Sequence, residues 1–62
     1  EFHGTVSALD TNAQTFVLRG LTFQYNNSTS MSGVTLANGL QLEIKATRTS
    51  GAWVATQIQT DD

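Results

Sequence analysis

The stretch LQLEIKATR, residues 40–48, decides the fold because its apolar and polar residues alternate strictly. One side of an extended chain would carry the apolar residues Leu40, Leu42, Ile44 and Ala46. The opposite side would carry Gln41, Glu43, Lys45 and Thr47. Successive side chains of a β-strand point to opposite faces of the sheet. The stretch therefore predicts a strand with one buried face and one face in water.

The residues that follow predict a hairpin with this strand. TSGA, residues 49–52, is a turn signal centred on Ser50-Gly51. WVATQIQT, residues 53–60, alternates again and predicts the last strand. One of its faces is expected to carry Val54, Thr56 and Ile58, and the other Trp53, Ala55 and Gln57. Asp61 and Asp62 are expected to be a frayed, solvated end.

The N-terminal half predicts three further strands. FHGTVSALD, residues 2–10, is the first, and Phe2, Gly4, Val6 and Ala8 are expected to share one of its faces. TFVLR, residues 15–19, and LTFQY, residues 21–25, are the next two. Their inward residues are expected to be Phe16, Leu18, Leu21, Phe23 and Tyr25. TNAQ, residues 11–14, forms the first turn with Asn12 in a left-handed conformation, and Gly20 marks a tight turn or a bulge.

The stretch YNNSTSMSGVTLANG, residues 25–39, joins the third strand to the strand at 40–48. Its Thr and Ser residues are poor helix formers, so at most one helical turn is expected, ending at Asn38-Gly39. Val34 and Leu36 are expected to close one end of the barrel. NNSTSMS, residues 26–32, is expected to be exposed and mobile, and deletion of residues 28–30 to cost little stability.

Three strands, a long crossover and two strands give the element order of an OB-fold. An open sheet of five strands would expose two edges, and closing it into a barrel removes them. The sequence therefore predicts an all-β, small five-stranded OB-like barrel with a long crossover loop before the fourth strand and little or no helix. Residues 1–62 are expected to form a single domain that is a fragment or a repeat unit of a larger exported protein.

The composition argues against several classes of function. The chain has 62 residues, no Cys, no Pro and a net charge of −2. A domain of this length buries only about 60% of its surface, so its large apolar residues are needed for the core and few remain to build a deep catalytic pocket. Its basic residues are Arg19, Lys45 and Arg48, and this small number argues against nucleic-acid binding. No apolar run is long enough to span a membrane.

Chemically active residue types are sparse, and none has an evident partner in the sequence. His3 has no evident acid beside it, and no serine of the crossover has a visible base. No His or Cys spacing suggests a zinc site, and Asp61-Asp62 lacks the ligand pattern of a calcium loop. The sequence therefore predicts no catalytic residue, no cofactor and no metal site.

Four segments resemble a known family: Gly4-Thr5-Val6, Phe16-Val17-Leu18, NGLQLEI at 38–44 and VATQI at 54–58. The pattern is similar to that of the bacterial domain of unknown function 5666. The resemblance implies an OB-like β-barrel found in exported bacterial proteins and lipoproteins, sometimes in tandem copies. It implies no catalytic residues. Family members usually carry a charged residue after the glycine of the fourth strand, where this chain has Leu40.

These observations favour a non-enzymatic structural or protein-interaction module, extracytoplasmic and monomeric in isolation. Amphipathic aromatic residues suit recognition of protein or carbohydrate. The expected binding residues are Tyr25, Asn26, Asn27, Trp53 and Gln57, with Trp53 on the outward side of the last strand. The favoured interpretation of Trp53 is nevertheless that it covers one end of the barrel against the long loop, because a core this small can rarely spare a Trp. The alternative function is an OB-like ligand-binding module for single-stranded nucleic acid or oligosaccharide.

Overall fold

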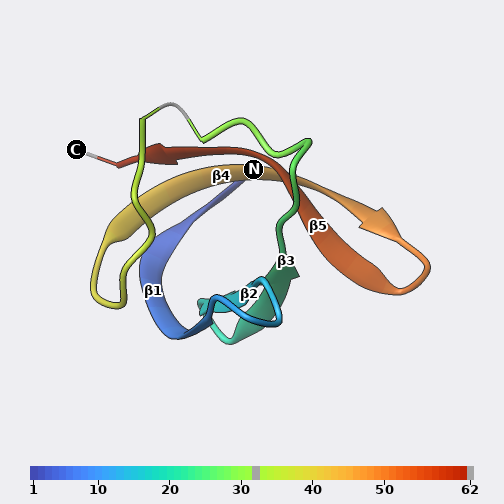
Figure 1. The fold of residues 1–62 in the computed structure, drawn as a ribbon, viewed down its shortest axis with the longest axis horizontal. Coiled ribbons are helices and arrows are strands. Elements are labelled where there is room, and N and C mark those ends of the chain that lie inside the picture. The colour runs from blue at the N-terminus through green and yellow to red at the C-terminus, as the bar shows by residue number, and fades with distance from the viewer. Residues whose placement is uncertain (32, 62) are drawn as a thin grey trace.

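A computed structural model describes residues 1–31 and 33–61 of the chain. The strands are β1 (Phe2–Asp10), β2 (Thr15–Leu18), β3 (Leu21–Gln24), β4 (Gln41–Thr49) and β5 (Ala52–Thr60). They form a closed barrel in the order β1-β2-β3-β5-β4 (Figure 1). The described residues contain no helix, and so none that could cross a membrane. The predicted all-β, five-stranded barrel is confirmed.

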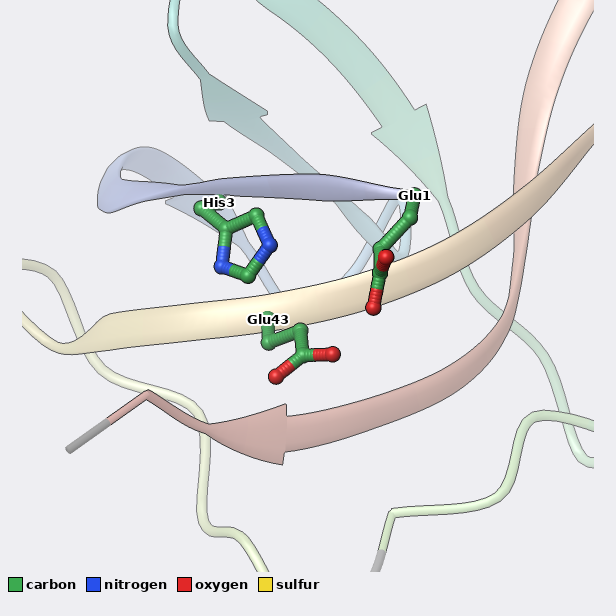
Figure 2. Close-up of side chains that lie close together, drawn as sticks. All are labelled: Glu1, His3 and Glu43. Atoms are coloured by element: carbon green, nitrogen blue, oxygen red, sulfur yellow. The ribbon is translucent and has the colours of Figure 1, made fainter.

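The strand pairing is that of an OB-like barrel. Sequential strands pair as antiparallel hairpins, except across the crossover between β3 and β4. β1 closes the barrel against β4 in antiparallel register, with His3 opposite Glu43 on the outer face (Figure 2). β3 lies parallel to β5, with Phe23 opposite Trp53. The crossover is long because it carries the chain from β3 to β4 across β5, which lies between them in the barrel.

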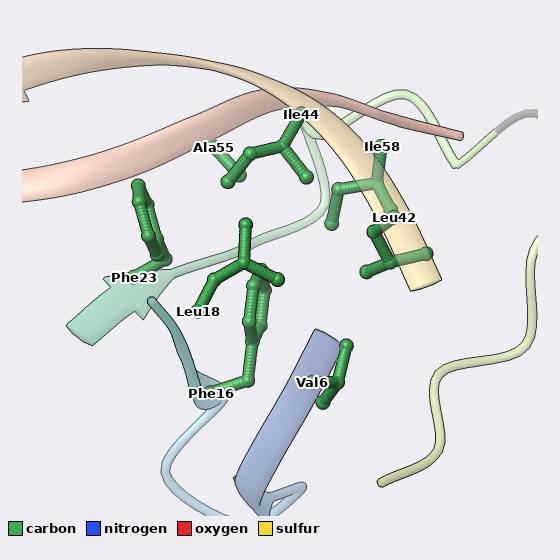
Figure 3. Close-up of a cluster of buried hydrophobic side chains, with 8 residues drawn as sticks. All are labelled: Val6, Phe16, Leu18, Phe23, Leu42, Ile44, Ala55 and Ile58. Atoms are coloured by element: carbon green, nitrogen blue, oxygen red, sulfur yellow. The ribbon is translucent and has the colours of Figure 1, made fainter. Parts of the chain in front are cut away.

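The core is filled by side chains from all five strands (Figure 3). The buried apolar residues are Val6, Phe16, Leu18, Phe23, Leu42, Ile44, Ala55 and Ile58. Val34 and Leu36 of the crossover pack partly buried against this cluster, as do Leu40 and Ala46 on either side of the buried β4 residues. The predicted inward faces of β2 and β4 are therefore confirmed.

The predicted face of β1 is wrong at one position because the strand contains a bulge. The register with β2 shifts between Ser7 and Asp10, and Ala8 has a φ of 50°. Ala8 is exposed, and Leu9 packs against the core in its place. A bulge inserts an extra residue and so reverses the alternation beyond it.

A second bulge overturns the predicted faces of β5. Lys45 of β4 pairs with Gln57 and the next residue, Ala46, pairs with Ala55, so Thr56 is the extra residue. Thr56 uses its hydroxyl to donate to the Lys45 carbonyl oxygen at 3.1 Å. Ala55 and Ile58 are both buried although they are three positions apart. The expectation that Val54, Thr56 and Ile58 share one face is therefore wrong.

One two-residue turn joins β2 to β3, and another joins β4 to β5. Arg19 and Gly20 have φ values of 53° and 79°, and Ser50 and Gly51 have values of 51° and 80°. Two consecutive positive φ angles in a two-residue loop define a type I′ turn, whose twist matches that of the flanking strands. The predicted turn at Ser50-Gly51 is confirmed, and Gly20 belongs to a tight turn. Leu21, expected inward, lies at the exit of its turn and is 39% exposed.

The turn before β2 differs from its prediction in one residue. The Asp10 carboxylate accepts the backbone N–H groups of Asn12 and Ala13, each at 3.0 Å. The left-handed residue is Gln14, with a φ of 58°, and Asn12 is not among the residues of positive φ. The hydrogen bonds of the Asp10 carboxylate hold the start of the turn, and the left-handed residue lies at the end of the turn.

The first part of the crossover is anchored to β5. Thr29 is buried, and its hydroxyl donates to the Ala55 carbonyl at 2.7 Å and accepts the Asn26 N–H at 3.0 Å. Ser30 donates its N–H to Thr56 O at 2.9 Å and accepts the Ile58 N–H at 2.7 Å, beside β5. The expectation that residues 26–32 are exposed is therefore wrong for Thr29, whereas Ser30 is exposed as expected but is held to β5 by its backbone. Its part at Ser32 lies outside the described residues.

The last part of the crossover is a turn fastened to β1 and contains no helical turn. Gly39 has a φ of 90° and donates its N–H to the Val6 carbonyl at 2.8 Å. The Asn38 side-chain oxygen accepts the Leu9 N–H at 2.9 Å, next to the β1 bulge. This turn therefore supplies the hydrogen-bond acceptor for the Leu9 N–H group beside the bulge. It also leads the chain into the pairing of β4 with β1.

Candidate functional site

Trp53, one of the residues expected to bind a partner, packs against other aromatic side chains. Trp53 is half-buried, with its ring edge-on to Phe2 at 5.1 Å between centroids and 6.4 Å from Phe23. It lies with the aromatic side chains packed on the core, so its expected outward position is wrong. The Arg48 guanidinium covers it at 5.4 Å from the ring centroid.

The other four expected residues differ in their surroundings. Tyr25 is half-buried with its ring 6.1 Å from that of Phe16. Asn26 accepts the Ser28 N–H at 2.8 Å and so shapes the crossover, and Asn27 is exposed. Gln57 lies opposite Lys45 on β5. Within residues 1–31 and 33–61, no hydrogen bond or ring contact joins Trp53 to any of the four.

A cluster of titratable side chains lies on the outer face of β1 and β4 instead. His3 and Glu43 are paired across the two strands, and Glu1 precedes His3 by two positions. One ligand atom from each of the three residues lies within 4.8 Å of the others (Figure 2). Glu1 and His3 are exposed and Glu43 is half-buried. We call these three residues the His3 cluster.

Asp61 adds a third carboxylate next to this cluster. The Asp61 N–H donates to the Gln41 carbonyl at 3.0 Å, which continues the β4–β5 pairing past the end of β5. Its carboxylate oxygen lies 3.1 Å from the Nδ1 atom of His3. The expectations that His3 lacks an acid and that Asp61 is frayed are therefore both wrong, whereas Asp62 lies outside the described residues.

Neighbouring groups lower the pKa of Glu1. The pKa of the Glu1 carboxyl is lowered, chiefly by a hydrogen bond with Glu43 and further by the charges of His3, the N-terminal amine and Lys45. Desolvation acts in the opposite direction. The Glu1 carboxylate therefore stays ionised to lower pH than a free one, as expected for an acid close to donors and positive charge.

An open groove of about 280 Å³ adjoins the cluster. Its lining comes from β1, β4, the β2–β3 turn and the residue after β5, and comprises His3, Gly4, Thr5, Arg19, Gln41 and Asp61. A Cβ atom at Gly4 would lie 2.7 Å from Cγ of Arg19. Glycine is therefore needed here for the Arg19 side chain to lie across β1. Glycine inside a strand often marks such a close approach.

A second feature is the edge of β4 beyond its contact with β1. β1 pairs with Gln41 to Ile44, whereas β5 pairs with β4 as far as Thr49. Among residues 1–31 and 33–61, no strand pairs with the other side of Lys45–Thr49. The β4–β5 hairpin extends past the barrel there (Figure 1). We call Lys45–Thr49 the open edge.

The direction of the backbone groups on the open edge follows from their neighbours. The Leu40 carbonyl accepts from Val6 of β1, and the Gln41 carbonyl accepts from Asp61 beyond β5. Backbone groups of successive residues in a strand point to opposite sides. Ala46 and Arg48 therefore direct their N–H and C=O groups away from β5, toward the open side.

The family model of the domain of unknown function DUF5666 matches residues 3–59. The chain belongs to this family. The match confirms the resemblance drawn from the sequence. No curated protein and no solved structure matches the chain.

The DUF5666 match contains His3, Glu43 and the open edge, whereas Glu1 and Asp61 lie just outside it. Sequence reasoning missed the His3 cluster, although Glu1 and His3 have the spacing of one strand face. The contribution of Glu43 depends on the register of β1 against β4, about 40 residues apart in the chain. No local pattern reports that register.

Proposed function

We propose that this chain is a non-enzymatic protein-interaction module of an exported bacterial protein, which binds an extended segment of a partner protein along the open edge. The observation that carries the proposal is the register of β4. Lys45–Thr49 are held by β5 on one side and have no paired strand on the other among the described residues. A strand edge of this kind presents unpaired N–H and C=O groups to another chain.

The side chains around the open edge favour a partner with acidic residues. Lys45 and Arg48 are exposed on this part of β4. Arg48 also lies over Trp53, which is half-buried at the same hairpin. Charge complementarity increases the rate and the selectivity of association, and a half-buried Trp offers apolar area beside the edge. The expected occupant is therefore an extended acidic segment with an apolar side chain near Trp53.

Composition and family support the remaining parts of the proposal. Only 13% of the residues are charged, and the polar surface is rich in Thr, Ser, Asn and Gln. This composition is frequent in extracytoplasmic bacterial proteins, and the family resemblance points the same way. A non-enzymatic role is supported by the core, which takes up most of the large apolar side chains of a 62-residue chain.

The test is a selection of unstructured displayed peptides on the immobilised domain, followed by titration of the best peptide into three proteins. Arg48→Thr removes the side-chain charge but keeps the backbone donor, whereas Arg48→Pro also removes the N–H group that faces the open side. We expect acidic peptides that bind the Arg48→Thr variant up to about 10-fold more weakly, and that do not bind Arg48→Pro. Equal binding to the two variants would contradict pairing along the edge.

Single-stranded nucleic acid or oligosaccharide is the second candidate, and the Arg48–Trp53 pair favours it. A base or sugar ring can stack on an aromatic side chain beside an Arg. The same domain is therefore titrated with a short single-stranded DNA and with an oligosaccharide at two salt concentrations. Shifts centred on Trp53 that Arg48→Thr abolishes and that peptides do not produce would replace the peptide proposal.

A further inference from the structure

We propose that Glu1, His3 and Glu43 bind one divalent transition-metal ion of the zinc type. The site lies on the outer face of β1 and β4 and shares no residue with the open edge. One imidazole nitrogen and two carboxylate groups are a donor set that zinc accepts. The inference does not rest on the proposed function, because neither Ala46 nor Arg48 takes part.

The spacing of the donor atoms fits an ion after small side-chain movements. The three ligand atoms lie within 4.8 Å of one another. A tetrahedral ion with ligands at about 2.0–2.1 Å requires ligand atoms about 3.3 Å apart. The remaining difference is of the size of a side-chain adjustment, and Glu1 and His3 are exposed enough to make it. The strand register, which places His3 opposite Glu43, already fixes the backbone positions.

Asp61 gives the cluster a feature that a group of surface carboxylates lacks. Its carboxylate lies 3.1 Å from Nδ1 of His3, so that Nδ1–H can donate to it and Nε2 is left with the free lone pair. The imidazole turns its other nitrogen toward the side of Glu1 (Figure 2). A carboxylate on the non-ligating nitrogen orients a metal-binding histidine and raises its basicity. Asp61 is therefore a positioning residue for the ligand His3.

The donor set also selects among cations. Calcium prefers six to eight oxygen ligands, whereas imidazole suits zinc and its neighbours in the transition series. Three protein ligands leave a fourth position for water, as in zinc sites that are not closed. Because Glu1 and His3 are exposed, that position is accessible to solvent.

The experiment is a titration of the 62-residue chain with Zn²⁺, and separately with Ca²⁺, at neutral pH. The N-terminal amine is acetylated so that it cannot act as a ligand. His3 is the single histidine of the chain, so its imidazole nitrogen resonances report binding without ambiguity. We expect saturation at one Zn²⁺ per chain, with a shift of the His3 Nε2 resonance, and no such shift with Ca²⁺.

Four variants separate a built site from adsorption on the acidic surface. We expect His3→Ala to abolish saturable binding, Glu43→Gln to weaken it at least 10-fold, and Asp61→Asn to weaken it about 10–100-fold. Asp10→Asn is the matched control, since Asp10 lies at the far end of β1 and an Asn oxygen can still accept its turn hydrogen bonds. Its affinity should equal that of the parent chain.

Two results would overturn the inference. One is the absence of a saturable His3 shift with millimolar Zn²⁺ in a chain whose amide spectrum shows the folded barrel. The other is equal loss of affinity in Glu43→Gln and Asp10→Asn, which would show that Zn²⁺ responds only to net charge. Neither result bears on the peptide proposal, which depends on Arg48.

Discussion

Thr29 shows how a single residue of the crossover stabilises the barrel. It is the buried polar residue among those described, and its hydroxyl both donates to Ala55 O and accepts from Asn26 N. Thr29→Val keeps the shape but leaves the two backbone groups without their partner. We expect a loss of about 1–3 kcal/mol in the free energy of unfolding, measured with urea. Exposed Ser28→Ala is the control and should change it by less than about 0.5 kcal/mol; equal losses would contradict the anchoring role.

Leu42 tests the assignment of the buried face of β4. Its side chain is fully buried in the core cluster. Leu42→Ala should lower the free energy of unfolding by about 2–5 kcal/mol, which is a large part of the stability of a small domain. The neighbouring exposed residue, in Gln41→Ala, should change it by less than about 0.5 kcal/mol. Circular dichroism during denaturation distinguishes the two variants, and a larger effect at Gln41 would reverse the assignment.

At the scale of elements, the faces of the unbulged strands β2 and β4 were predictable, whereas β3 failed at Leu21 and the bulged strands were predictable only in part. The alternation of β4 was read correctly because every residue from Leu40 to Ala46 keeps its place in the pleat. In β1 and β5 the alternation fails at Ala8 and Thr56, where one strand has an extra residue. A bulge is defined by the pairing of two strands, so the sequence of one strand does not reveal it.

The β4–β5 turn gives a prediction at this scale. Gly51 has a φ of 80°, a conformation in which a Cβ atom clashes with its own backbone. Gly51→Ala should therefore lower the free energy of unfolding by about 1–2 kcal/mol. Ser50→Asn should raise it, because Asn-Gly is the preferred pair of a type I′ turn. Thermal unfolding measures both, and a stabilised Gly51→Ala variant would contradict the turn type.

The crossover reverses an expectation that was drawn from loop length alone. A disordered loop tolerates shortening because its closure entropy depends weakly on length. Residues 28–30, however, include Thr29, whose side chain is buried. They also include Ser30, whose backbone pairs with β5. Their deletion should unfold the domain, as seen by collapse of its amide spectrum. A folded deletion variant would show that β5 does not need these contacts.

At the scale of the whole molecule, neither candidate surface was visible in the sequence. The His3 cluster and Asp61 combine residues from both ends of the chain with one from β4, and only barrel closure brings them together. The open edge lies beyond the pair of Phe2 with Ile44, and this register is a property of the folded barrel. Two of the expected binding residues, Trp53 and Asn26, make contacts within the core and the crossover that their residue type alone does not reveal. Composition can indicate which residue types are available, but not their tertiary register.

Amide hydrogen exchange, measured residue by residue with and without the selected peptide, tests the central claim most directly. In the free domain the amides of Ala46 and Arg48 should exchange fast, whereas those of Thr47 and Thr49, which face β5, should be protected. Peptide binding should protect Ala46 and Arg48. Slow exchange of these two amides in the free domain, or their continued fast exchange in the complex, would contradict binding along the open edge.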